Sequence, residues 1–293
     1  MLFSDLAYQI LANGAKQTNT DPRDYLVVFA SESMLDPATT KGTPFHGFNT
    51  MGKQAAVDVG LDPDFWEWLP DLGSEDNMRA SMQFFLENLR RYRRNGFANA
   101  LDAYLFNFAP SIWATNAGPD TVIYQAPSAA YYENATMDNY PALLSFAQAE
   151  KIVFKNSKDI AAAAKIALER GDVLKGKITL ADLRAFLMRP GARSIWQPHV
   201  DRLTELGLAP GTPYTLVSYP ERPGGGAYNP DVGWQDFAKQ RQARGVLSPA
   251  PSPEPGLVKS NALAWFVAGT VAAAAGLIWW HVRQLPRRAR RAT

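Results

Sequence analysis

The sequence contains no cysteine. Disulfide bonds, zinc sites with thiolate ligands and cysteine nucleophiles are therefore excluded. Histidine is also scarce: the chain has only His46, His199 and His281, and their wide separation gives no spacing typical of a metal site. We therefore expect neither a bound metal nor a cofactor.

The chain also lacks a large excess of charge of either sign. The formal net charge is +2, and the C-terminal segment 281–293 is rich in arginine, so the remainder is close to neutral. A nucleic-acid-binding domain would carry a basic face. Because the chain before the basic tail is close to neutral, we expect no nucleic-acid partner. The first residues, 1–14, have neither the basic region nor the cleavage site of a secretory signal. How the chain would cross a membrane is therefore left open by the sequence.

Residues 262–280 form a run without any charged residue. At about 1.5 Å per residue, a helix of this length is roughly long enough to cross the core of a bilayer. Trp265, Trp279 and Trp280 lie near its ends, where interfacial aromatic residues are typical. The run predicts a single transmembrane helix, and the alternative is a buried helix of a soluble protein. By the positive-inside rule the basic tail 281–293 would place the C-terminus on the cytoplasmic side, but moving a folded N-terminal part across a membrane without a signal is difficult, and the sequence leaves the orientation open.

The proline-rich segment 247–261 predicts a linker before that helix. Two globular stretches precede it, 1–135 and 136–246, and the first predicts a mainly α-helical fold. Its helix-start signal is Asp21-Pro22, an N-cap acceptor followed by proline. A further helix is expected from Ser74, and a long loop is expected at 37–50. The apolar stripe of the helix from Ser74 comprises Met78, Met82, Phe85, Leu86 and Leu89.

The second stretch, 136–246, is expected to be a helical accessory region. Residues 175–184 are similar to the end of a calcium-binding EF-hand loop. The positions that would supply calcium ligands are Gly171, Val173 and Lys175, and none has an oxygen-rich side chain. We therefore expect a helix capped at or near Thr179 rather than a calcium site.

Glu32 is the candidate catalytic residue. It lies seven, four and three residues after Tyr25, Val28 and Phe29, so on a helix it shares their apolar face. Burial there raises the pKa of a carboxyl group, and a carboxyl that is protonated at neutral pH can act as a general acid. The alternative is a solvent-facing glutamate at the helix end, because Asp36-Pro37 stops the helix shortly afterwards.

Residues 20–115 contain an ordered set of elements that resembles the lytic transglycosylase family, the soluble lytic transglycosylase or goose-lysozyme-like group. These elements are Glu32-Ser33, then Gly47-Phe48-Asn49-Thr50, then Ala55-Ala56 with Gly60, and finally Asn77 and Ala103-Tyr104. The resemblance implies a lysozyme-like helical catalytic domain over 1–135.

The same resemblance implies cleavage of the β-1,4 bond between N-acetylmuramic acid and N-acetylglucosamine, with formation of a 1,6-anhydro ring. Glu32 would act first as acid and then as base. The implied substrate-binding residues are Ser33, Gly47, Phe48, Thr50, Tyr104 and Asn107. Two positions depart from the family pattern: Thr50 replaces a glutamine, and Leu105 replaces an asparagine for which we expect Asn107 to substitute.

Two other functions stay open. A hydrolytic lysozyme would need a second carboxylate, for which Asp36 and Glu67 are the candidates. A non-catalytic structural protein could instead keep the fold to bind peptidoglycan or other virion or envelope proteins. Trp66 and Trp68 could stack on sugar rings. We expect a single-pass membrane protein of a phage virion or a bacterial envelope, and the missing signal favours the phage virion.

Overall fold

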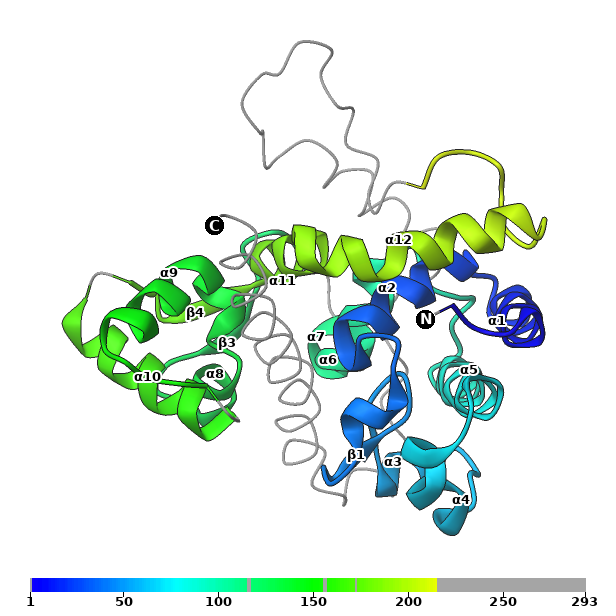
Figure 1. Cartoon of the computed structure of the whole chain (residues 1–293), viewed down its shortest axis with the longest axis horizontal. Helices are drawn as coiled ribbons and strands as arrows, with labels where there is room; N and C mark the ends of the chain where they lie inside the picture. Colours follow the sequence, from blue (N-terminus) through cyan, green and yellow to red (C-terminus); the bar gives the residue numbers. More distant parts are fainter. Residues whose placement is uncertain (1, 115–116, 155–156, 172, 215–293) are drawn as a thin grey trace, which may run out of the picture.

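The computed structural model describes residues 2–114, 117–154, 157–171 and 173–214, and this part of the chain is mainly α-helical (Figure 1). The predicted mainly α fold class is therefore confirmed. The first elements are α1 (Asp5–Gln17), α2 (Pro22–Ser33), η1 (Pro37–Thr40), β1 (Phe45–His46), β2 (Met51–Gly52), α3 (Lys53–Asp58), α4 (Pro63–Trp68), η2 (Leu69–Asp71), α5 (Ser74–Arg91), α6 (Ala100–Phe108) and α7 (Pro110–Trp113). They are followed by β3 (Val122–Gln125), α8 (Ala129–Glu133), α9 (Thr136–Ala149), α10 (Ser157–Arg170), β4 (Lys177–Thr179), α11 (Leu180–Met188) and α12 (Pro190–Glu205).

Helix α2 lies at the centre of the molecule and contacts α1, α6, α11 and α12. The predicted start is confirmed, because the Asp21 side chain accepts a hydrogen bond from the backbone N–H of Arg23 and Pro22 opens the helix. The helix ends at Met34, which has left-handed backbone angles. Every residue from Arg23 to Ser33 is buried, so α2 has no solvent-exposed face on which a polar side chain could be hydrated.

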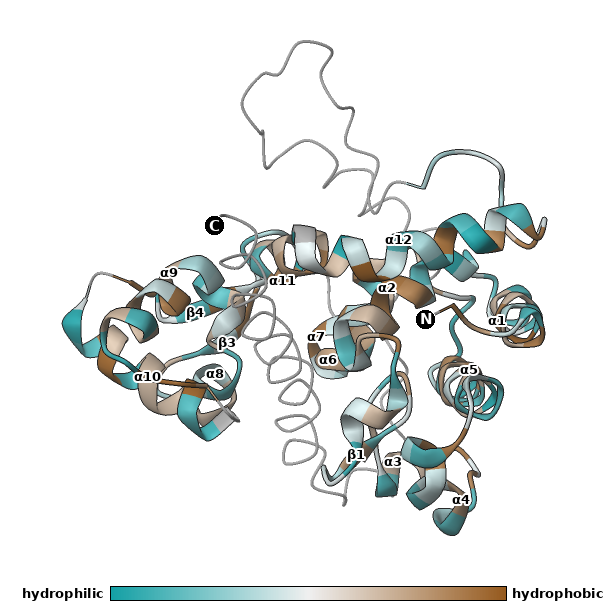
Figure 2. Cartoon of the chain, in the orientation of Figure 1, coloured by the Kyte–Doolittle hydropathy of each residue, from teal (hydrophilic) through white to brown (hydrophobic). Residues whose placement is uncertain are grey.

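The core around α2 is rich in aromatic rings. Tyr25 and Phe29 of α2 pack against Phe85 of α5, with ring centroids 5.0 and 6.2 Å away, and Tyr25 meets the edge of Phe97. The helix expected from Ser74 is confirmed as α5, and its apolar stripe faces this core except for Leu86, which is half-buried. Hydrophobic and hydrophilic residues are interspersed along α12, as expected for a helix covered on one side (Figure 2), and the buried residues of α5 likewise lie on one face.

The two globular stretches share one hydrophobic core. Trp196 and Leu203 of α12 belong to the same buried cluster as Tyr25 and Phe29 of α2. A buried polar contact accompanies this packing, because the Tyr8 hydroxyl lies 2.9 Å from Nδ1 of His199. The second stretch therefore covers the helix that carries Glu32.

The last described residues are attached to the start of α2. Arg23 donates hydrogen bonds to the backbone carbonyls of Pro210 and Thr212, at 3.1 and 2.8 Å. Tyr214 donates to Asp24 at 2.7 Å. Burial raises the pKa of Asp24 to about 8, and this second buried carboxyl group of α2 is thus engaged in a structural contact.

Two small antiparallel sheets complete the fold. In the first, Phe45 pairs with Gly52 and His46 with Met51, so residues 47–50 form the connecting turn. In the second, β3 pairs with β4. Residues 37–50, expected as a loop, thus contain the short helix η1 and the first strand of a hairpin.

The cap expected at Thr179 is confirmed. The Thr179 hydroxyl accepts from the backbone N–H of Asp182, whose carboxylate accepts from the backbone N–H of Thr179. This capping box starts α11. We expect Thr179→Ala to lower the free energy of unfolding by about 1 kcal/mol. Urea denaturation measures the change, with Ser145→Ala on an exposed face of α9 as control; equal effects of the two substitutions would contradict the role of the cap.

The predicted linker 247–261, transmembrane helix 262–280 and basic tail 281–293 lie outside the described residues. Among the helices that the structure does describe, none has both the length and the apolar composition needed to cross a bilayer.

Candidate active site

Glu32 occupies the last turn of α2 and is 1% exposed. Its Oε2 accepts a hydrogen bond from the Thr50 hydroxyl. The other carboxyl oxygen, Oε1, is buried and has no hydrogen-bond partner among the residues that the structure describes. The apolar position predicted from the spacing is therefore confirmed, and one oxygen of the carboxyl group is left unsatisfied.

Burial raises the pKa of Glu32 from its ordinary value of 4.5 to about 7. Thr50, Asn107 and Tyr104 oppose this shift, in that order, because their polar groups stabilise the carboxylate. The carboxyl group is thus about half protonated at neutral pH. Such a group can both donate and accept a proton at that pH, as general acid–base catalysis requires.

The turn of the β1–β2 hairpin positions Thr50. Gly47 has φ +84°, which glycine adopts without strain, and Thr50 donates its backbone N–H to the Gly47 carbonyl at 3.1 Å. Thr50 itself has φ +49°, an uncommon conformation for a β-branched residue that costs about 1–3 kcal/mol. Backbone strain of this kind is concentrated at functional sites. Here it accompanies the contact between the Thr50 hydroxyl and Glu32.

The rest of the turn connects the hairpin to the core and to α6. Phe48 is fully buried and packs between Phe3 and Phe29, with centroids 5.0 and 5.6 Å away. The backbone carbonyl of Asn49 accepts a hydrogen bond from the Asn107 side chain at 3.2 Å. The predicted residues Gly47, Phe48 and Thr50 therefore lie in one turn beside Glu32, although Phe48 contributes to the aromatic core.

Tyr104 and Asn107 are three residues apart on α6 and both affect the pKa of Glu32. Neither completes a hydrogen bond of normal geometry to it, and the buried Tyr104 hydroxyl has no partner. Burial and the nearby Glu32 raise the pKa of Tyr104 well above 10, so the hydroxyl keeps its proton and can donate it. Leu105 is fully buried in the core. Asn107, and not Leu105, lies beside Glu32.

Ser33 follows Glu32 in the chain but contacts a different group. Its hydroxyl donates to the backbone carbonyl of Phe29 at 3.2 Å, within α2. The Ser33 hydroxyl is thus engaged within its own helix, and its substrate-binding role stays a prediction.

The two candidates for a second carboxylate are engaged elsewhere. Asp36 is exposed and accepts from the backbone N–H of Ala38 at 3.0 Å, at the start of η1. Glu67 is exposed and forms an ion pair with Lys53, which lowers the pKa of Glu67. Within the described ranges, no second carboxylate contributes to the raised pKa of Glu32.

The tryptophans of α4 differ in exposure. Trp66 is buried, stacks on His46 with centroids 4.2 Å apart and donates its indole N–H to the Met51 carbonyl at 2.9 Å. Trp68 is 61% exposed. His46 contacts backbone carbonyls of Trp66 and Thr43 through its two ring nitrogens. Trp66 therefore packs against the hairpin that carries Thr50, whereas the ring of Trp68 is exposed to solvent.

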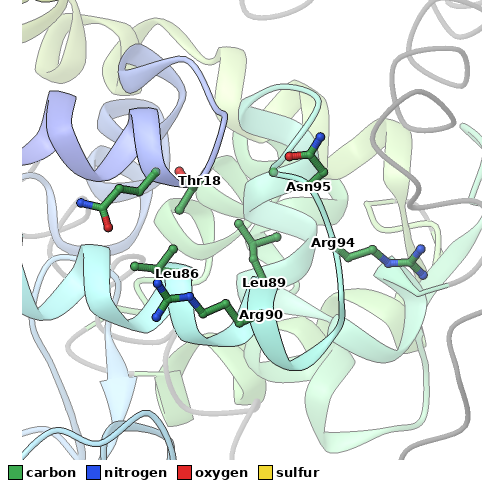
Figure 3. A pocket seen from close by; sticks show the side chains of 8 residues that line it. Thr18, Leu86, Leu89, Arg90, Arg94 and Asn95 are labelled. Atoms are coloured by element: carbon green, nitrogen blue, oxygen red, sulfur yellow. The ribbon is translucent and has the colours of Figure 1, made fainter.

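A cavity of about 240 Å³ lies between the end of α1 and the end of α5 (Figure 3). It is lined by Gln17, Thr18, Leu86, Leu89, Arg90, Arg94, Asn95 and Gly96. None of these is a predicted site residue. The cavity is therefore separate from the group of residues around Glu32.

Sequence reasoning missed Arg189, whose charge acts on Tyr104. It also missed Asn49, which connects the hairpin to α6. The position of Asn49 inside the matching turn could have marked it, but no pattern in the sequence connects Arg189 with a tyrosine so far upstream. Comparison of the chain with protein-family models, with curated proteins and with solved structures found no match.

Removing the Thr50 hydroxyl tests the electrostatic account of the site. The hydrogen bond from Thr50 lowers the pKa of Glu32, so Thr50→Val should raise that pKa further above about 7. Valine keeps the β-branched shape and hence the backbone strain. An NMR titration of the glutamate side-chain carboxyl carbons measures the shift, with Thr204→Val on α12 as control. An unchanged or lower pKa in Thr50→Val would contradict the contact.

Proposed function

We propose that this protein is a membrane-anchored peptidoglycan lytic transglycosylase in which Glu32 is the only catalytic acid and base. The observation that carries the proposal is a buried carboxyl group with a pKa of about 7 and no second carboxylate that affects it in the described part of the chain. Most glycosidases use two carboxyl groups, so a lone one favours a reaction in which one group acts twice.

In the proposed reaction, Glu32 first protonates the oxygen that joins N-acetylmuramic acid to N-acetylglucosamine. The bond from C1 of the muramic acid to that oxygen breaks, and the substrate's own acetamido group stabilises the positive centre at C1. The Glu32 carboxylate then takes the proton of the C6 hydroxyl while O6 forms a bond to C1. The product is a 1,6-anhydro ring, Glu32 is protonated again, and no water is consumed.

The neighbours of Glu32 suit this double role. Burial favours the protonated form that begins the reaction, whereas Thr50, Asn107 and Tyr104 stabilise the carboxylate that the first step creates. The balance keeps the pKa close to neutral, so neither protonation state is strongly disfavoured. Thr50 thus supplies a donor to the acid at the position where the resembling family has glutamine.

The proposed location follows from the uncharged run 262–280 and the arginines after it. A single helix would hold the enzyme at a membrane, either in a phage virion or in a bacterial envelope, next to the wall that it opens. Its partners would be glycan strands of peptidoglycan and neighbouring virion or envelope proteins.

Digestion of purified murein sacculi tests the reaction. The full chain, in a non-ionic detergent, is incubated with sacculi, and the released muropeptides are separated and weighed by mass spectrometry. Muropeptides with 1,6-anhydromuramic acid ends support the proposal. Products heavier by one water, with reducing ends, would indicate a hydrolase instead, and intact sacculi would exclude both enzymes.

One observation favours a second function, a non-catalytic wall-binding protein. Glu32 is only 1% exposed, so a glycan strand reaches it only if the side chains above it move. A protein that merely retains the fold would not need that movement. Co-sedimentation with sacculi without any release of muropeptides would support this second function.

A further inference from the structure

Arg189 lies at the junction of α11 and α12, where it ends the first helix and precedes the second. Helix α11 packs against α6, which carries Tyr104 and Asn107. The positive charge of Arg189 acts on the hydroxyl groups of Tyr104 and Tyr140. A residue of the second stretch therefore lies beside the group that contains the proposed acid.

The guanidinium group of Arg189 is held in place but is not neutralised. Its Nη1 donates to the Phe186 carbonyl, and its carbon Cζ lies 3.5 Å from the centroid of the Phe186 ring. The other terminal nitrogen, Nη2, is buried and has no hydrogen-bond partner in the described part of the chain. Arg189 forms no ion pair with a carboxylate of the described residues.

Such an arrangement is costly for folding. Arg189 as a whole is half-buried, but its Nη2 atom is enclosed, and a buried donor without a partner loses its hydration without compensation. Burial lowers the pKa of Arg189 to about 10, which still leaves the group charged at neutral pH. The structure thus keeps a preorganised cation with one free donor, a feature that serves an anionic ligand better than it serves stability.

Three buried polar atoms near the proposed site lack hydrogen-bond partners among the described residues. Oε1 of Glu32, the hydroxyl of Tyr104 and Nη2 of Arg189 are all buried and without partners. Tyr104 interacts electrostatically with both of the others, whereas Arg189 does not contribute to the pKa of Glu32. Arg189, on the junction that follows α11, can therefore bind a part of the substrate other than the reacting bond without lowering the pKa of Glu32.

We propose that Arg189 binds a carboxylate of the muramic acid side chain, next to the bond that Glu32 cleaves. This inference rests on the proposed function. N-acetylmuramic acid differs from N-acetylglucosamine by a lactyl ether, which ends in a carboxylate in peptide-free glycan and continues into a stem peptide with its own carboxylates otherwise. A guanidinium group is suited to either, because its planar donors match the geometry of a carboxylate. Arg189 would then distinguish muramic acid from N-acetylglucosamine at this position.

Binding measurements with the full chain carrying Glu32→Gln test the proposal without cleavage. Calorimetry compares three probes: peptide-free glycan oligomers of peptidoglycan, the same oligomers with stem peptides, and oligomers of N-acetylglucosamine. Adding Arg189→Met should weaken binding of at least one muramic acid probe by about ten- to a hundredfold, as expected for a lost charged hydrogen bond. Binding of the N-acetylglucosamine oligomers should not change. The probe that loses more affinity identifies the carboxylate.

Arg193→Met is the matched control, because Arg193 is exposed one turn further along α12. It should leave all three affinities unchanged. Arg189→Met should also keep or raise the midpoint of thermal unfolding, since it removes a buried donor without a partner and retains a long side chain. A fall in the midpoint with equal loss for all probes would show a structural role and overturn the inference.

The outcomes separate the two proposals. If the full chain with Glu32→Gln binds no glycan probe, both the proposed function and the inference about Arg189 are wrong. If it binds muramic acid probes and Arg189→Met changes nothing, the inference about Arg189 is wrong and the proposed function stands. If the binding difference is found but wild-type protein leaves sacculi intact, Arg189 recognises muramic acid in a protein that is not an enzyme.

Discussion

The Glu32→Gln variant should lose about 10²–10⁴-fold in the rate of glycan cleavage, the usual contribution of a general acid or base. The amide can neither protonate the glycosidic oxygen nor take a proton from the C6 hydroxyl, so both steps fail. Its shape matches the carboxyl group, and it can still accept the hydrogen bond from Thr50. Anhydro-muropeptide release from sacculi measures the loss. A variant that cleaves at the wild-type rate would show that catalysis, if any, lies elsewhere.

Glu32→Gln, which should lower the rate of cleavage, should raise the stability of the folded protein above pH 7. The folded pKa of Glu32, about 7, exceeds its ordinary value of 4.5, so the folded state holds this proton more tightly than the unfolded state does. The associated stability is fully present below pH 4.5 and is lost as the pH rises through 7. At 1.36 kcal/mol per pKa unit the loss amounts to roughly 3 kcal/mol. Above pH 7 the Gln variant should therefore unfold at a higher urea concentration than wild-type protein.

The difference in unfolding between wild-type protein and the Glu32→Gln variant reports on Glu32 alone. Other buried groups, such as Asp24, titrate equally in both proteins. Glu67→Gln is the matched control: that residue is exposed, is paired with Lys53 and has no role in the proposed reaction. It should change neither cleavage nor the dependence of stability on pH between 4.5 and 7, because the lowered pKa of Glu67 places its own titration below that range. A parallel loss of activity in both variants would contradict a special role for Glu32.

How well the sequence predicted each part of the site depends on how far apart along the chain the contacting residues are. Glu32 was predictable because its burial follows from helical spacing to Tyr25 and Phe29, a local pattern. Asn107 was expected only from the resemblance, as a substitute for the asparagine that Leu105 replaces, and the structure has it three residues after Tyr104 on α6. The contact between Thr50 and Glu32 was not predicted, because it depends on the register of a hairpin whose strands have two residues each. Strands that short carry no alternating pattern from which a register can be predicted.

The packing of α12 against α2 could not be predicted from the sequence. Helix α12 packs along α2 although the stretches that contain them seemed to be separate units, and nothing in the composition of 136–214 marks that contact. Arg189 depends on this packing, since it approaches Tyr104 only when α11 lies against α6. The spacing of its neighbours predicts neither burial nor a missing partner. Such features follow from tertiary packing, which overrides local patterns.

Gly96→Ala should reduce the free energy of unfolding by more than about 4 kcal/mol, an exceptional loss for one methyl group. Gly96 joins α5 to α6 with φ +90°, which strains any residue with a Cβ. A Cβ at this position would lie 2.2 Å from the Thr18 carbonyl oxygen and 2.6 Å from that of Asn19. These are backbone atoms at the end of α1, so they cannot rotate away as a side chain could.

Gly118→Ala is the control, because a Cβ at Gly118 would meet no atom within 4 Å, and its effect should stay within about 0.5 kcal/mol. Urea denaturation of both variants measures the contrast. The result also concerns the proposed active site, since the connection at Gly96 sets where α6 begins and therefore where Tyr104 and Asn107 lie relative to Glu32. If Gly96→Ala were as stable as wild-type protein, the path from α5 to α6 would differ from the one in the structure, and the placement of both residues beside Glu32 would lose its support.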